Sequence, residues 1–97
     1  MSRRRPWLVA YDIASPRRLR RVHACLKRHG LPVQYSVFLL YTDRDGLETL
    51  LAELAALIHP ARDDVRAYRL PPGLWYKSVG APHLPRGLLA ALEGVSL

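Results

Sequence analysis

The sequence predicts a small α/β protein in which two helices pack on one face of a single sheet. Apolar, β-prone runs alternate with amphipathic helical patterns in the order strand–helix–strand–helix–strand. With 97 residues the chain has room for one hydrophobic core, so we expect a single domain over residues 1–97. The composition, 49% hydrophobic and 24% charged, is that of a folded domain and argues against disorder.

The first strand and first helix are marked by local signals. Five apolar residues from Trp7 onwards precede Asp12 and predict a buried strand over 7–13. Ser15 and Pro16 then provide an N-cap and a first helical residue, and Gly30 ends the helix. The apolar face of the helix consists of Leu19, Val22 and Leu26. Its basic face consists of Arg17, Arg20, Arg21, Lys27 and Arg28.

The middle of the chain predicts one strand and one leucine-rich helix. Residues 33–41 alternate as a strand that is apolar on both sides, with no turn residue to interrupt it. The helix that follows stops before Pro60. Its broad apolar stripe comprises Leu47, Leu50, Leu51, Leu54, Leu57 and Ile58.

The C-terminal third predicts two more strands, over 64–70 and 74–79, separated by a Pro-Pro-Gly turn. A Pro-rich connection over 80–87 and a short apolar tail follow. If both helices cover one face of the sheet, the face carrying Ser36, Phe38 and Leu40 needs another cover. We expect a second copy of the chain to supply it, which predicts a homodimer.

The distribution of charge indicates a polyanionic partner. The net charge is +7, and residues 1–44 hold ten Lys or Arg against two Asp. Such a concentration favours nucleic acid over an anionic membrane, because no basic amphipathic segment ends in bulky lipid-facing aromatics. Thirteen of the fifteen cations are Arg, which suits bidentate phosphate contacts, although a GC-rich genome produces the same bias.

Four arginines, Arg17, Arg18, Arg20 and Arg21, open the first helix. No acidic residue balances them between Pro16 and Tyr41, and cations in a first turn oppose the helix dipole unless an anion neutralises them. Phosphate contact is the functional interpretation; a solvated helix face is the alternative.

Cysteine and hydropathy patterns predict a protein of the reducing cytoplasm. Cys25 is the only cysteine and cannot form an internal disulfide, and no Cys or His spacing suits a zinc site. The arginine-rich start superficially resembles an export signal, but Asp12 interrupts the apolar stretch after it too early. No segment approaches the length of a membrane span.

Asp12 is the strongest candidate for chemistry. It stands at the carboxyl end of the first strand, the edge of an α/β sheet where ligands bind. A carboxylate there could hold a hard divalent metal against a phosphate, or it could simply cap the loop into the first helix. A twofold axis would bring a second Asp12 to the first and make a two-carboxylate site.

An ordered set of segments resembles a known family. These segments are Tyr11-Asp12-Ile13, the arginine-rich helix, Gln34-Tyr35-Ser36-Val37-Phe38, the leucine helix, Asp63 to Leu70, and Val79-Gly80. Over about nine-tenths of its length the chain is similar to the CRISPR-associated "Cas two" family, the small partner of the adaptation integrase. The family fold has two strands between the helices. In this chain we expect one bent strand over 33–41 to take the place of both.

The resemblance implies a ferredoxin-like fold with a mostly antiparallel sheet, and a homodimer in which residues 80–97 pair with the partner subunit. It implies a nuclease dependent on Mg²⁺ or Mn²⁺, with Asp12 as metal ligand and Tyr11, Ser36 and Phe38 as further catalytic residues. It assigns nucleic-acid binding, by region only, to Arg17, Arg18, Arg20, Arg21 and Arg28.

Three functions remain open at the level of sequence. One is a metal-dependent endonuclease acting on RNA or DNA. A second is a binding scaffold that grips duplex DNA and docks the integrase without catalysis. The third is a toxin-like ribonuclease of the same fold. All three need the same basic surface, so the sequence does not choose between them.

Overall fold

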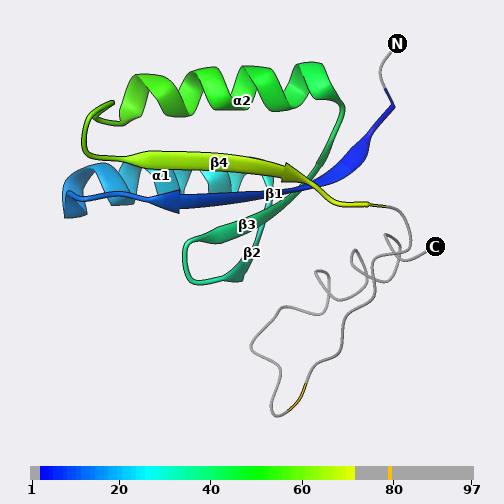
Figure 1. Cartoon of the computed structure of the whole chain (residues 1–97), viewed down its shortest axis with the longest axis horizontal. Helices are drawn as coiled ribbons and strands as arrows, with labels where there is room; N and C mark the ends of the chain where they lie inside the picture. The colour runs from blue at the N-terminus through cyan, green and yellow to red at the C-terminus, as the bar shows by residue number, and fades with distance from the viewer. Residues whose placement is uncertain (1–2, 72–78, 80–97) are drawn as a thin grey trace.

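The helices and strands follow one another in the order β–α–β–β–α–β (Figure 1). The computed structural model describes residues 3–71 and Val79. Its elements are β1 (Arg5–Asp12), α1 (Pro16–His29), β2 (Leu31–Gln34), β3 (Val37–Thr42), α2 (Arg44–Leu57) and β4 (Asp64–Arg69). The strand expected over 74–79 and the C-terminal extension lie outside the described residues, except Val79, which belongs to no helix or strand.

The four strands form one antiparallel sheet in the order β2-β3-β1-β4. The central strand β1 pairs with β3 on one side and with β4 on the other. This order with two crossing helices is the ferredoxin-like arrangement, so the expected fold class is confirmed. Neither described helix is long and apolar enough to cross a bilayer.

Helix α1 begins and ends as its sequence predicts. The Ser15 hydroxyl accepts a hydrogen bond from the Arg18 backbone N–H, and Pro16 occupies the first turn. At the other end the Gly30 N–H donates to the Leu26 carbonyl at 2.9 Å. Gly30 is extended, with φ −150°, so glycine is needed here for space: a Cβ would lie 2.5 Å from the carbonyl oxygen of Leu39.

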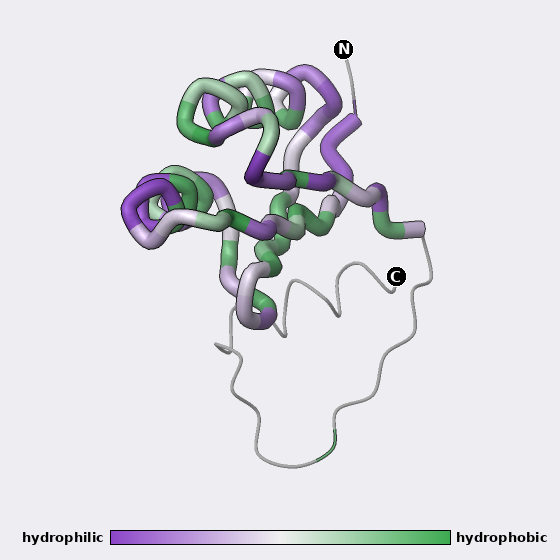
Figure 2. The backbone as a smooth tube through the Cα atoms, turned by 60° about the vertical axis from the view of Figure 1, so that its left-hand side comes forward, coloured by the Kyte–Doolittle hydropathy of each residue, from purple (hydrophilic) through white to green (hydrophobic). Residues whose placement is uncertain are grey.

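The hydrophobic core lies between the sheet and the two helices, which cover the same face (Figure 2). Sheet and helices meet through ten buried residues: Val9, Tyr11, Phe38 and Leu40 from the strands, and Val22, Cys25, Leu26, Leu47, Leu50 and Leu54 from the helices. The apolar periodicity of both helices therefore identified their buried faces correctly.

The segment between the helices is a hairpin, and the prediction of one strand over 33–41 was wrong. Strands β2 and β3 pair antiparallel around a turn at Tyr35 and Ser36. Ser36 adopts the left-handed conformation, φ 64°. Glycine or asparagine usually marks such a position, and neither is present. The turn was missed for that reason.

The expected bare face of the sheet was also wrong. Phe38 and Leu40 point towards the helices and are 1% and 2% exposed. Alternation along a strand separates two faces but does not say which one the helices cover. These two residues therefore give no argument for a second subunit.

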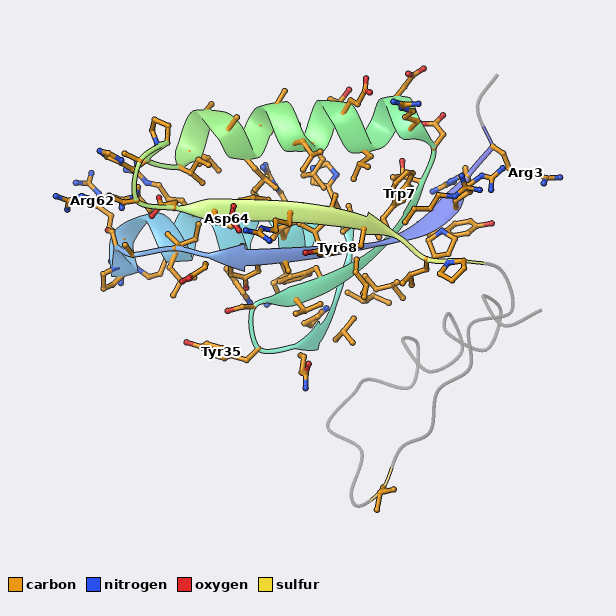
Figure 3. All side chains as sticks on the ribbon, viewed as in Figure 1. Arg3, Trp7, Tyr35, Arg62, Asp64 and Tyr68 are labelled. Atoms are coloured by element: carbon orange, nitrogen blue, oxygen red, sulfur yellow. The ribbon has the colours of Figure 1, made fainter. Side chains whose placement is uncertain are left out.

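The other sheet face carries an apolar row that crosses all four strands. In direct register Leu31 lies opposite Leu39, Leu39 opposite Leu8, and Leu8 opposite Tyr68. Leu31 and Tyr68, at the two ends of the row, are 37% and 51% exposed, and Tyr41 beside it is 58% exposed, whereas Leu39 within the row is 4% exposed. Neither α1 nor α2 covers this face, on which the labelled Tyr68 lies (Figure 3).

Candidate active site and nucleic-acid interface

Asp12 is the last residue of β1 and is exposed to solvent. Val9 and Tyr11 face the helices, so the alternation of the strand puts Asp12 on the opposite face. Its direct partner across the sheet is Asp64, the first residue of β4. Side chains at such paired positions have Cβ atoms about 4.5–5.5 Å apart. The structure therefore brings two carboxylates together at one end of the sheet.

The two carboxylates differ in their surroundings. Asp64 accepts a hydrogen bond from Arg66 Nε at 2.7 Å. Within residues 3–71, Asp12 has no ion pair and accepts no side-chain hydrogen bond. Exposed oxygen donors of this kind fit Mg²⁺ or Mn²⁺, which bind through one or two carboxylates together with water and substrate phosphates.

The loop after Asp12 is tied to the loop before β4 by Asp63. Its carboxylate accepts hydrogen bonds from Ala14 N at 2.9 Å and His59 N at 2.8 Å. It also accepts two from Arg18, from Nε at 2.6 Å and from the terminal nitrogen at 3.1 Å. The side chain is fully shielded from solvent. Asp63 therefore joins the two strand ends that carry Asp12 and Asp64.

The interaction between Arg18 and Asp63 shifts the pKa values of both side chains. The hydrogen bonds from Arg18 hold the pKa of the Asp63 carboxyl well below its ordinary range, and the His59 and Ala14 amides add to this against the opposing effect of burial. The same hydrogen bond raises the pKa of Arg18. Arg18, expected to bind phosphate, has its guanidinium engaged by Asp63 in this structure.

The other expected nucleic-acid residues are exposed. Arg17, Arg20 and Arg21 lie on the solvent side of α1, and Arg28 lies 4.0 Å from Glu53 near the other end of that helix. The structure adds Arg62, which projects from the loop before β4 (Figure 3). The sequence analysis missed Arg62 because nothing local links it to the start of α1. The hydrogen bond from Arg18 to Asp63, the residue next to Arg62, shows that the loop before β4 lies beside the start of α1.

Tyr11, Ser36 and Phe38 come together, but away from Asp12. They line a cavity of about 800 Å³ between α1 and the hairpin. The Tyr11 N–H donates to the Ser36 carbonyl at 3.1 Å, and the Tyr11 and Phe38 rings lie 6.2 Å apart. His23 packs edge-on against Phe38 at 5.3 Å. The predicted catalytic residues thus divide between the two faces of the sheet.

The Tyr11 phenol is not suited to act as a base. It is 7% exposed, and burial raises its pKa, with Tyr35 adding to the effect. The phenol is therefore neutral at physiological pH. Among the described residues, Asp12 and Asp64 are the groups at this end of the sheet that carry exposed negative charge.

Comparison with known proteins gives a consistent result. A sequence profile described as CRISPR associated protein Cas2 matches residues 5–77. The chain is 39% identical over 82 residues to CRISPR-associated endoribonuclease Cas2 1 of Nitrosomonas europaea, covering 84% of this chain and 78% of that protein. It is 46% identical over 68 residues to CRISPR-associated endoribonuclease Cas2 2 of Thermodesulfovibrio yellowstonii, covering 70% and 75%.

Solved structures agree on the fold. A crystal structure of a hypothetical protein, TT1823 from Thermus thermophilus, superposes with a TM-score of 0.75 at 32% identity, covering 86% of this chain and 99% of that one. The crystal structure of Streptococcus pyogenes Cas2 superposes with a TM-score of 0.66 at 28% identity, covering 77% and 99%.

Proposed function

The chain belongs to the CRISPR-associated Cas2 family, and from this premise we propose that it is a homodimeric, metal-dependent endonuclease of CRISPR adaptation. RNA is the favoured substrate, because the two relatives described above are named endoribonucleases. The observation that carries the proposal is the exposed Asp12 directly opposite Asp64 at the end of the sheet. The basic start of α1 lies immediately after it in the chain.

The residues at this end have separate tasks in the proposed reaction. Asp12 holds a divalent ion, and Asp64 lies within reach of the same ion. When bound, Mg²⁺ or Mn²⁺ supplies charge neutralisation at the phosphate and lowers the pKa of a bound water. Arg17 and Arg62 contact neighbouring phosphates, which orients the strand. The Asp63–Arg18 pair keeps the Asp12 loop in place.

A second copy of the chain is the proposed cover for the apolar sheet face. An apolar row is formed by Leu31, Leu39, Leu8 and Tyr68. In an isologous interface this row of one copy packs against the same row of the other. Asp12 and Asp64 lie on the same face at its end. A twofold axis through this face would therefore place one pair of carboxylates from each subunit at the rim of the interface.

A non-catalytic scaffold is the second candidate function. Arg17, Arg20 and Arg21 form no ion pair with any acidic residue in the described part of the chain. Their charge supports binding of duplex DNA with or without a metal. In this alternative the dimer holds DNA beside the integrase and Asp12 does no chemistry.

The decisive experiment compares cleavage by the wild-type protein and Asp12→Asn. We expect wild-type cleavage of single-stranded RNA that needs Mg²⁺ or Mn²⁺, and at least a hundredfold loss in Asp12→Asn, because the amide keeps the shape but loses the charge that a hard cation requires. Asp45→Asn, an exposed change at the start of α2, is the matched control and should cleave normally. Metal-dependent cleavage that persists in Asp12→Asn would remove Asp12 from the mechanism, and a wild-type protein without cleavage would favour the scaffold.

A further inference from the structure

A second cluster of metal-ligating side chains lies between the two helices. Cys25 and His29 are four residues apart on α1, so they occupy the same side of that helix. Glu53 approaches them from α2. One ligand atom from each of the three residues lies within 4.8 Å of the others. The sequence analysis found no metal spacing here because the third ligand belongs to the other helix.

The separations within this Cys25–His29–Glu53 cluster match a tetrahedral site. Zinc–ligand bonds of about 2.0–2.3 Å at tetrahedral angles put neighbouring donor atoms roughly 3.3–3.6 Å apart. Glu53 Oε2 lies 3.4 Å from Cys25 Sγ and 3.5 Å from His29 Nε2. Two of the three ligand–ligand edges are therefore in place. The third, between Cys25 and His29, is at most 4.8 Å long, and the His29 side chain is 41% exposed.

The chemistry of the three groups selects the kind of metal. A thiolate, a carboxylate and a neutral imidazole together balance the charge of a divalent ion. Thiolate and imidazole favour Zn²⁺ over Mg²⁺ or Mn²⁺, which prefer oxygen. The neighbouring Arg28, 4.0 Å from Glu53, is 72% exposed and able to turn into solvent.

We propose that Cys25, His29 and Glu53 form a zinc site that joins α1 to α2, with water completing the coordination. Cys25 is 2% exposed and supplies the inner ligand, while His29 and Glu53 close the site from the solvent side. The site lies near the C-terminal end of α1, whereas Asp12 precedes the start of that 14-residue helix. At 1.5 Å per residue the helix separates the two by roughly 15–20 Å, so this zinc site is independent of the proposed catalytic metal.

The test uses the full-length, tag-free protein, stripped of metal by chelation, with zinc or cobalt ions as the probes. We expect one Zn²⁺ per chain by calorimetry, a rise in Tm when zinc is added, and a thiolate-to-metal absorption band with Co²⁺. His29→Ala and Glu53→Gln should each weaken zinc affinity about tenfold or more. Glu48→Gln, an exposed change on the same helix α2, should bind zinc as the wild type does.

Several outcomes would overturn the proposal: no stoichiometric zinc binding, cobalt binding without the thiolate band, or unchanged zinc affinity in both His29→Ala and Glu53→Gln. Both replaced side chains are about two-fifths exposed, so the metal-free variants should keep the wild-type circular dichroism spectrum. Asp12→Asn should retain the full zinc response. Loss of that response in Asp12→Asn would show that zinc binds at the sheet edge and would also overturn the proposal.

Discussion

At the scale of single residues, Asp63 organises the end of the sheet without occupying the exposed site itself. Its shielded carboxylate accepts hydrogen bonds from the loop after β1, from the loop before β4 and from α1. A buried charge is tolerated only when it is paired and hydrogen-bonded in this way. Removing the charge should therefore leave Arg18 and two backbone amides poorly satisfied.

Asp63→Asn should lower Tm at pH 7. It should also make the loss of stability smaller as the pH is lowered to 3. The sign follows from the depressed pKa of Asp63. A carboxyl whose pKa is lower in the folded than in the unfolded protein stabilises the fold at pH values above its unfolded pKa, near 3.9. That contribution is lost progressively as the pH falls below this value, and the variant has none to lose. Thermal unfolding at pH 7 and at pH 3 measures the difference.

Asp45→Asn is the control for Asp63→Asn, because Asp45 is exposed and carries no ion pair among the described residues. A loss of Tm at pH 7 in Asp63→Asn no larger than in Asp45→Asn would contradict the anchoring role. The same would follow if wild type and Asp63→Asn lost stability in parallel between pH 4 and pH 3.

At the scale of elements, α1 uses its two sides differently. Val22, Cys25 and Leu26 are buried against the sheet and α2, while Arg17 and Arg20 point to solvent. The helix therefore presents a rigid row of cations whose position is set by the core packing beneath it. In the proposed function this row contacts phosphates without reading sequence.

Replacing Arg17 and Arg20 together by Gln should weaken binding to duplex DNA and flatten its salt dependence. Each phosphate contact contributes about 0.9 to the slope of log K against log salt concentration, so the loss of two should reduce that slope by roughly 1.8. Binding isotherms at several salt concentrations measure this. Arg44→Gln, on α2 and paired with Glu48, is the control. An unchanged slope would move the contact surface to the arginines at the start of the chain.

The hairpin between α1 and α2 offers a second test at this scale. Ser36 has φ 64°, a conformation that costs most residues about 1–2 kcal/mol, against an entropic cost of about 0.5–1 kcal/mol for glycine. Ser36→Gly should therefore raise the free energy of unfolding by about 0.5–1 kcal/mol, measured by urea denaturation. If cleavage is also unchanged, the Ser36 hydroxyl has no catalytic task. Ser36→Val should destabilise the protein, because a β-branched residue is poorly tolerated there.

At the scale of the whole molecule, the two faces of the sheet have different surroundings. One packs against the helices, and the other carries the apolar row, in which Leu31 and Tyr68 are exposed and Leu39 is buried. The polar end of the same face carries Asp12 and Asp64. The proposed dimer interface and the proposed metal site therefore lie on one continuous surface.

The protein should have a mass near twice its 11.0 kDa chain mass in light scattering. Tyr68→Lys should shift it towards the monomer, since a lysine charge would be buried by the partner. Tyr68 is 51% exposed, so the change should leave the chain folded. Tyr35→Lys, at a turn position that is 90% exposed, is the control. A wild-type monomer at micromolar concentration, or an undisturbed dimer in Tyr68→Lys, would rule out this interface.

The sequence by itself determined the elements whose signals are local. Ser15 and Pro16 begin α1 as expected, and the leucine stripe packs α2 on the core. The segment after Pro60 forms its strand within one residue of the predicted end. Asp12 was likewise recognisable as a carboxylate at the carboxyl end of β1. In each case neighbours a few residues apart determine the outcome.

Only the tertiary structure decided what long-range contacts control. Periodicity marks two faces of a strand, but packing chose the one with Phe38 as the core. The turn at Ser36 forms because β2 pairs with β3, and not because of its residue type. The partners of Arg18 and Cys25 lie 45 and 28 residues away along the chain. A side chain's nearest charge is set by the fold, and no pattern along the chain carries that information.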